Sequence, residues 1–176
     1  MGRRSGLKPL NRLLITIVTL CVSVLTASCA GGGATVPTVT LIPSPQEVKP
    51  GEQFAIEVQV EPVEHGISAV EIDLSFEPNT MQVIEVQPGT LLSERPLSGI
   101  LNIDNEAGTL RYSLARIGET EAPTEAATFA DITFRVLQWA AAGEHELDLS
   151  SAGFADEKFE DIPDIELKGT SIKISS

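Results

Sequence analysis

The stretch ISAVEIDLSFEPNTMQVIEVQPGTLL, residues 67–92, carries the most regular pattern in the chain. Over residues 70–76 apolar side chains alternate with polar ones, which is the period of a β-strand that buries one face and exposes the other. Pro78 and Asn79 interrupt the pattern, because proline lacks a backbone donor and asparagine tolerates turn geometry. An apolar, β-rich segment resumes at residue 81. The stretch therefore predicts a strand, a turn and a second strand.

Similar short segments recur on both sides of this stretch, with glycine- and proline-rich turns between them and no convincing helical period. The loop 105–108 ends in Gly108, which is free to adopt positive φ and so favours a hairpin. Short strands with alternating faces predict an all-β fold, a nine-stranded β-sandwich, but leave its strand order open. The predicted strands are 38–42, 54–60, 68–76, 81–87, 100–104, 109–116, 130–136, 144–150 and 170–175.

The apolar positions of these strands predict the core. Both cysteines, Cys21 and Cys29, precede the first strand, so the domain has no disulfide and its stability must come from buried apolar side chains. The predicted core residues are Val58, Val70, Ile72, Leu74, Phe76, Leu114, Ile132, Phe134 and Val136.

Three segments together resemble the cohesin domain family. DLSFEPNTMQVIEVQPGTLL (73–92) is similar to the cohesin signature, with VKPGEQFAIEVQV (48–60) before it and NIDNEAGTLRYSLARIG (102–118) and FADITFRVL (129–137) after it. The resemblance spans roughly residues 38–175. It implies jelly-roll topology, in which the third, fifth, sixth and eighth predicted strands share a sheet whose outer surface receives a partner.

The family resemblance also implies a partner, the calcium-loaded dockerin module, and a set of partner-binding residues. Many cohesins carry an Asn-x-Asp pair where Ala69 and Glu71 stand here, and some carry an acid where Arg116 stands, which bears on dockerin specificity. Without the resemblance, these polar residues would be taken simply to face water. The candidate partner-binding residues are Ala69, Glu71, Asp73, Ser75, Asn102, Asp104, Arg111, Ser113, Ala115 and Arg116.

Residues 1–28 have the pattern of a lipoprotein signal peptide: a basic start, an apolar run at 13–25 and small residues before Cys29. This ending resembles a bacterial lipobox, which implies that Cys29 is lipidated. Residues 29–37 would then form a flexible glycine-rich tether, and residues 38–176 the domain. An ordinary signal peptide and an uncleaved anchor are the alternatives, and both general and twin-arginine export remain open. The pattern predicts a lipoprotein on the extracellular face of the cell membrane.

Charge and composition exclude several functions. Beyond residue 28 the chain has eight basic and 25 acidic side chains, a net charge of −17, which excludes nucleic acid and an electrostatic hold on anionic lipid. The only histidines are His65 and His145, expected at the surface, and no cysteine follows Cys29, so nucleophilic catalysis lacks its residues. A glycosidase needs only two carboxylates, but the chain is poor in aromatic platforms. We therefore predict that the protein is not an enzyme.

Two further features are candidate binding sites. Trp139 is expected to cover the end of the core, the alternative being an exposed indole that stacks on a sugar. The acidic segment 156–164 lacks the residue order of an EF-hand loop, so we expect a solvated loop, no metal and no cofactor.

These observations favour a non-catalytic, lipid-anchored, cohesin-like module that receives a dockerin-type partner and is linked to polysaccharide binding or breakdown. A carbohydrate-binding module and a structural envelope lipoprotein are the alternatives. The presence of dockerin repeats in the same genome would discriminate between them.

Overall fold

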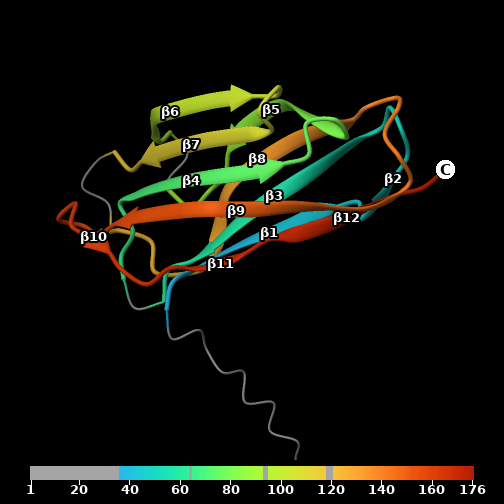
Figure 1. Cartoon of the computed structure of the whole chain (residues 1–176). Helices are drawn as coiled ribbons and strands as arrows, with labels where there is room; N and C mark the ends of the chain where they lie inside the picture. Colours follow the sequence, from blue (N-terminus) through green and yellow to red (C-terminus); the bar gives the residue numbers. More distant parts are fainter. Residues whose placement is uncertain (1–35, 64, 93–94, 118–120) are drawn as a thin grey trace, which may run out of the picture. The chain divides into compact units, whose positions relative to one another are not determined.

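The computed structural model describes residues 36–63, 65–92, 95–117 and 121–176, and consists there of strands joined by loops (Figure 1). Cys29 and the predicted signal peptide lie outside the described residues. In the described ranges no helix has the length and apolar character needed to cross a membrane. The strands are β1 (Thr38–Ser44), β2 (Glu47–Val48), β3 (Gln53–Glu61), β4 (Ala69–Phe76), β5 (Met81–Pro88), β6 (Leu97–Asp104), β7 (Thr109–Ala115), β8 (Ala127–Val136), β9 (Gly143–Ala155), β10 (Asp161–Ile162), β11 (Glu166–Lys168) and β12 (Thr170–Ile174).

The strands form two stacked sheets, so the predicted all-β sandwich with jelly-roll topology is confirmed (Figure 1). One sheet has the order β11-β1-β3-β8-β5, and the other has the order β2-β12-β9-β4-β7-β6, with β10 paired to β9. β4, β6, β7 and β9 correspond to the third, fifth, sixth and eighth predicted strands. They lie in one sheet, as the family resemblance implied.

The strand count differs from the predicted nine because three strands were missed. β2, β10 and β11 have two or three residues each, too few to show an alternating pattern. β9 also continues to Ala155, past the predicted end at residue 150. The pairing of β4 with β9 shifts register between Asp73 and Leu74, and this irregularity interrupts the period-2 alternation in β9.

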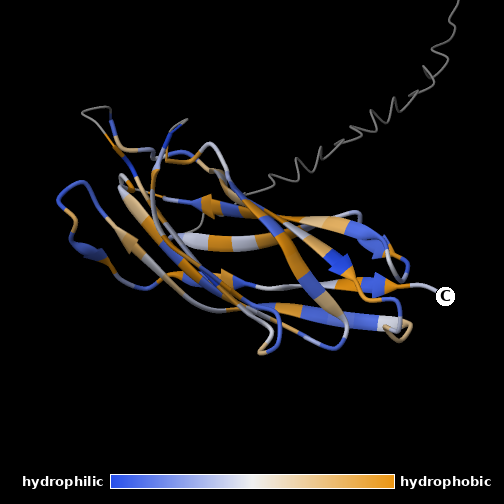
Figure 2. Cartoon of the chain, turned by 90° about the horizontal axis from the view of Figure 1, so that it is seen from above, coloured by the Kyte–Doolittle hydropathy of each residue, from blue (hydrophilic) through white to orange (hydrophobic). Residues whose placement is uncertain are grey.

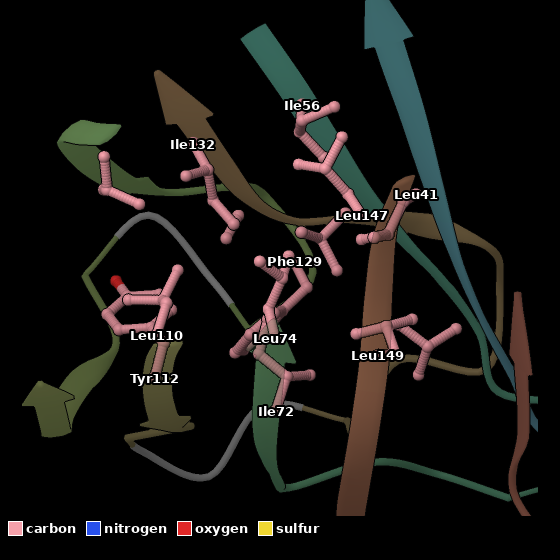
Figure 3. Close-up of a cluster of buried hydrophobic side chains, with 14 of the residues drawn as sticks. Leu41, Ile56, Ile72, Leu74, Leu110, Tyr112, Phe129, Ile132, Leu147 and Leu149 are labelled. Atoms are coloured by element: carbon pink, nitrogen blue, oxygen red, sulfur yellow. The ribbon is translucent and has the colours of Figure 1, made fainter. Parts of the chain in front are cut away.

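The apolar sides of both sheets meet in a single core. Figure 2 shows hydrophobic and hydrophilic residues alternating along the strands, and Figure 3 shows buried side chains from both sheets packed together, among them Ile72 and Ile132. All nine predicted core residues are buried, so this prediction is confirmed. Phe134 stacks on Phe54, with ring centroids 5.3 Å apart, and meets Phe76 edge to face. Burial raises the pKa of Tyr112, whose ring packs against Phe129 in the same core.

The hairpin between β6 and β7 is fixed at its loop by two residues. Gly108 has φ of +70°, and a Cβ there would lie 2.2 Å from the Phe76 carbonyl oxygen, so only glycine fits. The Asn105 side chain accepts a hydrogen bond from the Val83 N–H (2.7 Å) and donates one to the Val83 carbonyl (3.1 Å). Since Val83 belongs to β5 of the opposite sheet, Asn105 joins the two sheets at this end of the sandwich.

Candidate partner-binding face

The outer surface of β9, β4, β7 and β6, here called the candidate face, brings most of the predicted residues together. Antiparallel pairing places Ala69 opposite Ala115 and Asp73 opposite Arg111, on the outward side of adjacent strands. Because alternation sends Val70, Ile72 and Leu74 into the core, the residues between them point outward. Predicted residues that share this outward side are Ala69, Glu71, Asp73, Ser75, Asn102, Asp104, Arg111, Ser113 and Ala115.

Arg111 lies in the middle of the candidate face and pairs with two acids of β4. Its guanidinium forms an ion pair with Glu71, in which Nε also donates to Glu71 Oε1 (3.2 Å), and Nε lies 3.6 Å from Asp73 Oδ1. The hydrogen bond to Glu71, and then the charges of both acids, raise the pKa of Arg111. Arg111 therefore offsets one of the two negative charges at the centre of the candidate face.

Asp73 is also held from β9. The Ser151 hydroxyl donates to Asp73 Oδ2 (2.6 Å), and the Ser150 hydroxyl donates to the Asp73 carbonyl oxygen (3.1 Å). Both contacts lie at the register shift between the two strands. Asp73 is thus part of the strand pairing as well as of the outer surface.

Ser113, in β7, forms a side-chain hydrogen bond that helps to shape the neighbouring strand β6. Its Oγ accepts a hydrogen bond from the Ile100 N–H (2.7 Å) at an irregular step of the β6–β7 pairing. A Cβ on Gly99 would lie 2.5 Å from Ser113 Oγ, so glycine at this position makes room for the hydroxyl. This hydrogen bond positions Ser113 before any partner arrives.

Asp104, Asn102 and Arg116 occupy the margins of the predicted set. Asp104 Oδ1 accepts hydrogen bonds from the N–H groups of Glu106 (3.0 Å) and Ala107 (2.8 Å), so this carboxylate shapes the hairpin turn. Asn102 is exposed opposite Arg111 in β6. Arg116 follows β7, where its N–H donates to the Ser68 carbonyl oxygen (2.7 Å) and its guanidinium lies 3.5 Å from Ser68 Oγ.

One end of the candidate face is hollowed. The depression has a volume of about 370 Å³ and is lined mainly by small or apolar residues. Sequence reasoning placed only part of this lining in the candidate face, because the hollow depends on β9 beyond residue 150, on β10 and on the irregular start of β6. The residues that line the hollow are Ala69, Val70, Glu71, Leu97, Gly99, Ser113, Leu114, Ala115, Gly153, Phe154, Ala155 and Asp161.

Two expectations outside the candidate face need correction. Trp139 was expected to cover the end of the core, but its residue surface is 74% exposed in the loop between β8 and β9, so this prediction is wrong.

His145 was expected to be an ordinary surface residue, yet its side chain is only 12% exposed. Its Nδ1 lies 2.8 Å from Glu77 Oε2 and its Nε2 lies 3.0 Å from the Ala141 carbonyl oxygen, so the ring links three segments. His65 is exposed in a loop, as expected.

The acidic segment 156–164 contains a turn built by its first residue. Asp156 Oδ1 accepts hydrogen bonds from the N–H groups of Glu160 (3.0 Å) and Lys158 (2.7 Å), and these bonds lower the pKa of Asp156. Phe159, between these donors, has φ of +62° and is 65% exposed. In the described part of the chain no three His, Cys, Asp or Glu side chains are grouped closely enough to hold a metal ion.

Comparison with solved structures gives relatives of low sequence identity and the same fold. A non-cellulosomal cohesin from the archaeon Archaeoglobus fulgidus is 17% identical, with a TM-score of 0.64 over 80% of this chain and 92% of that chain. A type I cohesin–dockerin complex from Clostridium thermocellum matches with 16% identity and a TM-score of 0.64, over 80% of this chain and 99% of that chain. A cohesin module of a family 33 glycoside hydrolase from Clostridium perfringens matches with 18% identity and a TM-score of 0.63, over 81% and 98%.

Sequence comparison points to the same family. No curated protein sequence matches the chain significantly. The family model of the cohesin domain, however, matches residues 38–174, which include every described strand. The chain therefore belongs to the cohesin domain family.

Proposed function

We propose that this protein is a non-catalytic docking module that receives a dockerin-type, calcium-loaded helical partner on the candidate face. The observation that supports this proposal most is the candidate face itself, where nine of the ten predicted partner residues share one outward surface of β4, β7 and β6. Solved relatives include a cohesin in complex with a dockerin. Polar groups arranged on a rigid sheet suit the recognition of a partner helix, because their positions are fixed before binding.

Two substitutions test the candidate face. Glu71→Ala removes an outward carboxylate, and we expect it to weaken binding of a calcium-loaded dockerin by roughly 1–3 kcal/mol, since a charge-assisted hydrogen bond buried by the partner is lost. Asp131→Ala is the control, because Asp131 is exposed on β8 of the opposite sheet. Glu57 is a poorer control, since its carboxylate accepts a hydrogen bond from Thr128 Oγ1 (2.7 Å).

The measurement is calorimetry with dockerin modules encoded by the same genome, with calcium and with a chelator. Equal effects of Glu71→Ala and Asp131→Ala would place the docking site elsewhere. Binding that does not require calcium would contradict a dockerin partner.

The same proposal includes a lipid anchor at Cys29, supported by the small residues that precede this cysteine and follow an apolar run. Acyl chains contribute about 0.8 kcal/mol per buried CH₂, and durable attachment needs more than one chain. Cys29→Ser should therefore release the protein from the membrane fraction or block its maturation. An unmodified Cys29 in mass spectra of the mature wild-type protein would refute the anchor.

A second candidate function, carbohydrate binding, is favoured by one observation, the exposed indole of Trp139. Exposed indoles have an apolar ring on which the faces of sugars can stack. Trp139→Ala should abolish retention on the cognate polysaccharide and leave dockerin binding unchanged. Equal retention of the wild type and this variant on polysaccharide columns would remove the candidate.

A further inference from the structure

The hollow gives the candidate face an apolar end that the polar residues of its centre do not share. Leu97 contributes an apolar side chain that is 58% exposed, and Ala69, Ala115 and Ala155 pair in register on neighbouring strands. Their short side chains leave space where longer ones would fill the surface. A depression of about 370 Å³ holds about a dozen waters at roughly 30 Å³ each, and apolar walls bind such waters poorly. A large apolar side chain that displaced them would gain free energy from burial.

The rim of the hollow is acidic. Asp161 and Glu71 contribute carboxylates to the lining, and Glu71 is already paired with Arg111, whereas Asp161 lies exposed on β10. The loop that leads into β10, residues 156–160, has three acids and one base, Lys158, and of these acids Glu157 accepts a hydrogen bond from the Ala122 N–H (3.4 Å). This charge favours a cationic group at the rim. It also disfavours a second copy of this chain as the occupant, because that copy would bring the same negative charge.

Phe159 adds an exposed apolar side chain to the loop that leads into β10. It lies two residues before Asp161, is 65% exposed, and has a backbone φ of +62°. Positive φ is strained for a bulky aromatic residue and is adopted readily by glycine. Since the hydrogen bonds of Asp156 hold this turn, the loop keeps the exposed Phe159 in its strained backbone conformation. Strain of this kind concentrates at functional positions.

We propose that the partner of the candidate face is a helix that inserts a large apolar side chain into the hollow and places a Lys or Arg against Asp161, with Phe159 packed on its flank. This inference rests on the proposed docking function and specifies the chemistry of the partner. It also extends the contact surface beyond β4, β6 and β7 to the far end of β9 and to the loop 156–160. The central acids, which are already paired with Arg111, contribute less to specificity than the hollow.

Gly153→Leu is the substitution best suited to test the hollow. Gly153 lines it, and among the described residues no heavy atom lies within 4 Å of the position of a Cβ there, so the fold leaves open space where a side chain would enter the hollow. Thr133→Leu is the matched control, because it adds a similar apolar side chain to the outer surface of β8 in the opposite sheet. Asp161→Asn tests the charge. Phe159→Gly tests the ring and at the same time relieves its strained φ.

The probe is a calcium-saturated, two-helix dockerin scaffold displayed on yeast, with its exposed helix positions randomised and sorted against the full chain in detergent. We expect the selected binders to carry a Leu, Ile, Met or Phe close to a Lys or Arg. Their affinity should fall at least tenfold for Gly153→Leu and stay unchanged for Thr133→Leu. Asp161→Asn should weaken binding several-fold and flatten its salt dependence. Phe159→Gly should weaken binding without lowering Tm, a combination that a purely structural role does not produce.

The outcomes separate this inference from the proposed function. Binders that require calcium and bind the wild type and Gly153→Leu equally would show that the hollow is not part of the binding site. The proposed docking function would then remain intact. A library that yields no calcium-dependent binder would overturn the docking function itself. Self-association of the wild-type chain that Gly153→Leu abolishes would identify a second copy of the chain as the occupant of the hollow. It would refute the proposal that a partner helix binds there. If the wild type retained a sugar and Gly153→Leu did not, the occupant of the hollow would be a glycan, and the helix proposal would be refuted.

Discussion

Arg111 determines how available the two central carboxylates of the candidate face are to a partner. Its guanidinium bonds Glu71 and lies near Asp73, so a partner that sought these carboxylates would have to displace it. Alternation along β4 predicted that both acids point outward, but which cation pairs with them depends on strand register, which a sequence pattern does not give. The prediction that Trp139 covers the end of the core was wrong for a related reason. The direction of a loop side chain is set by the conformation of the loop and not by periodicity.

At the core, Ile72→Ala measures how much one buried side chain contributes. Ile72 is fully buried between the sheets (Figure 3), so we expect the free energy of unfolding to fall by roughly 2–5 kcal/mol through lost burial and a residual cavity. The measurement is urea unfolding at equilibrium. Ser75→Ala is the control, because Ser75 lies on the outer side of the same strand and should change the free energy by less than about 0.5 kcal/mol. Similar losses for both variants would contradict the assignment of faces.

Glu77 makes the stability of the domain depend on pH. Hydrogen bonds from His145 and then from Thr80 lower the pKa of Glu77 from its usual 4.5. A carboxylate with a lowered pKa in the folded state stabilises the fold above its unfolded pKa, and that stability is lost as pH falls through the lowered value. We therefore expect Tm to fall on acidification below pH 4.5, and to fall less steeply in Glu77→Gln.

A thermal unfolding series in acidic buffers measures this difference. Glu125→Gln is the control, because Glu125 is exposed in the loop before β8. Its acid dependence should match that of the wild type. If Glu77→Gln showed the wild-type slope, the bonds to His145 and Thr80 would not contribute to stability in solution.

At the scale of the strands, the sequence predicted those that are long and regular. β3, β4 and β7 alternate throughout, and β8 alternates from Ala130 onward, because each has one buried and one outward side in the middle of a sheet. β2 and β10 are too short to alternate, and the far half of β9 is broken by a register shift. The sequence therefore predicted the residues at the centre of the candidate face. It did not predict the hollow, because the hollow is built from irregular strand ends.

Asn105 gives a test of how the two sheets are joined. Asn105→Ala removes both hydrogen bonds to Val83 and leaves a buried N–H and carbonyl of β5 without their partner. We expect a loss of about 1–3 kcal/mol in the free energy of unfolding, since unsatisfied buried polar groups are costly. Native-state hydrogen exchange should show the largest loss of protection at Val83. Glu106→Ala, the exposed neighbour in the same loop, should have little effect, and equal protection at Val83 in wild type and Asn105→Ala would exclude the joining role.

For the whole molecule, the dominant feature is charge. Beyond residue 28, eight basic and 25 acidic side chains leave −17, and the described residues show few ion pairs to offset it, chiefly those of Arg111, Lys168 and Lys173. Self-repulsion opposes the compact state and is screened by salt, since the Debye length falls from about 30 Å at 0.01 M to about 10 Å at 0.1 M.

We therefore expect the protein to be more stable in salt. Raising NaCl from 0.01 to 0.5 M should add about 1 kcal/mol to the free energy of unfolding, equivalent to about 2–4 °C in Tm. KCl should give the same result at equal ionic strength. A Tm that stays constant or falls would mean that the charges are too far apart in the fold to repel.

The pairing of β1 with β11 has a consequence for the timing of folding. Thr38 lies opposite Glu166 in a parallel pair, and its hydroxyl reaches that glutamate across 128 residues of chain. β12 likewise completes the second sheet between β2 and β9. Contacts between residues so distant in sequence form late, because the intervening chain must be ordered first. A chain that crosses a membrane unfolded, with its amino end leading, can therefore complete neither sheet until residues 166–174 have emerged on the far side.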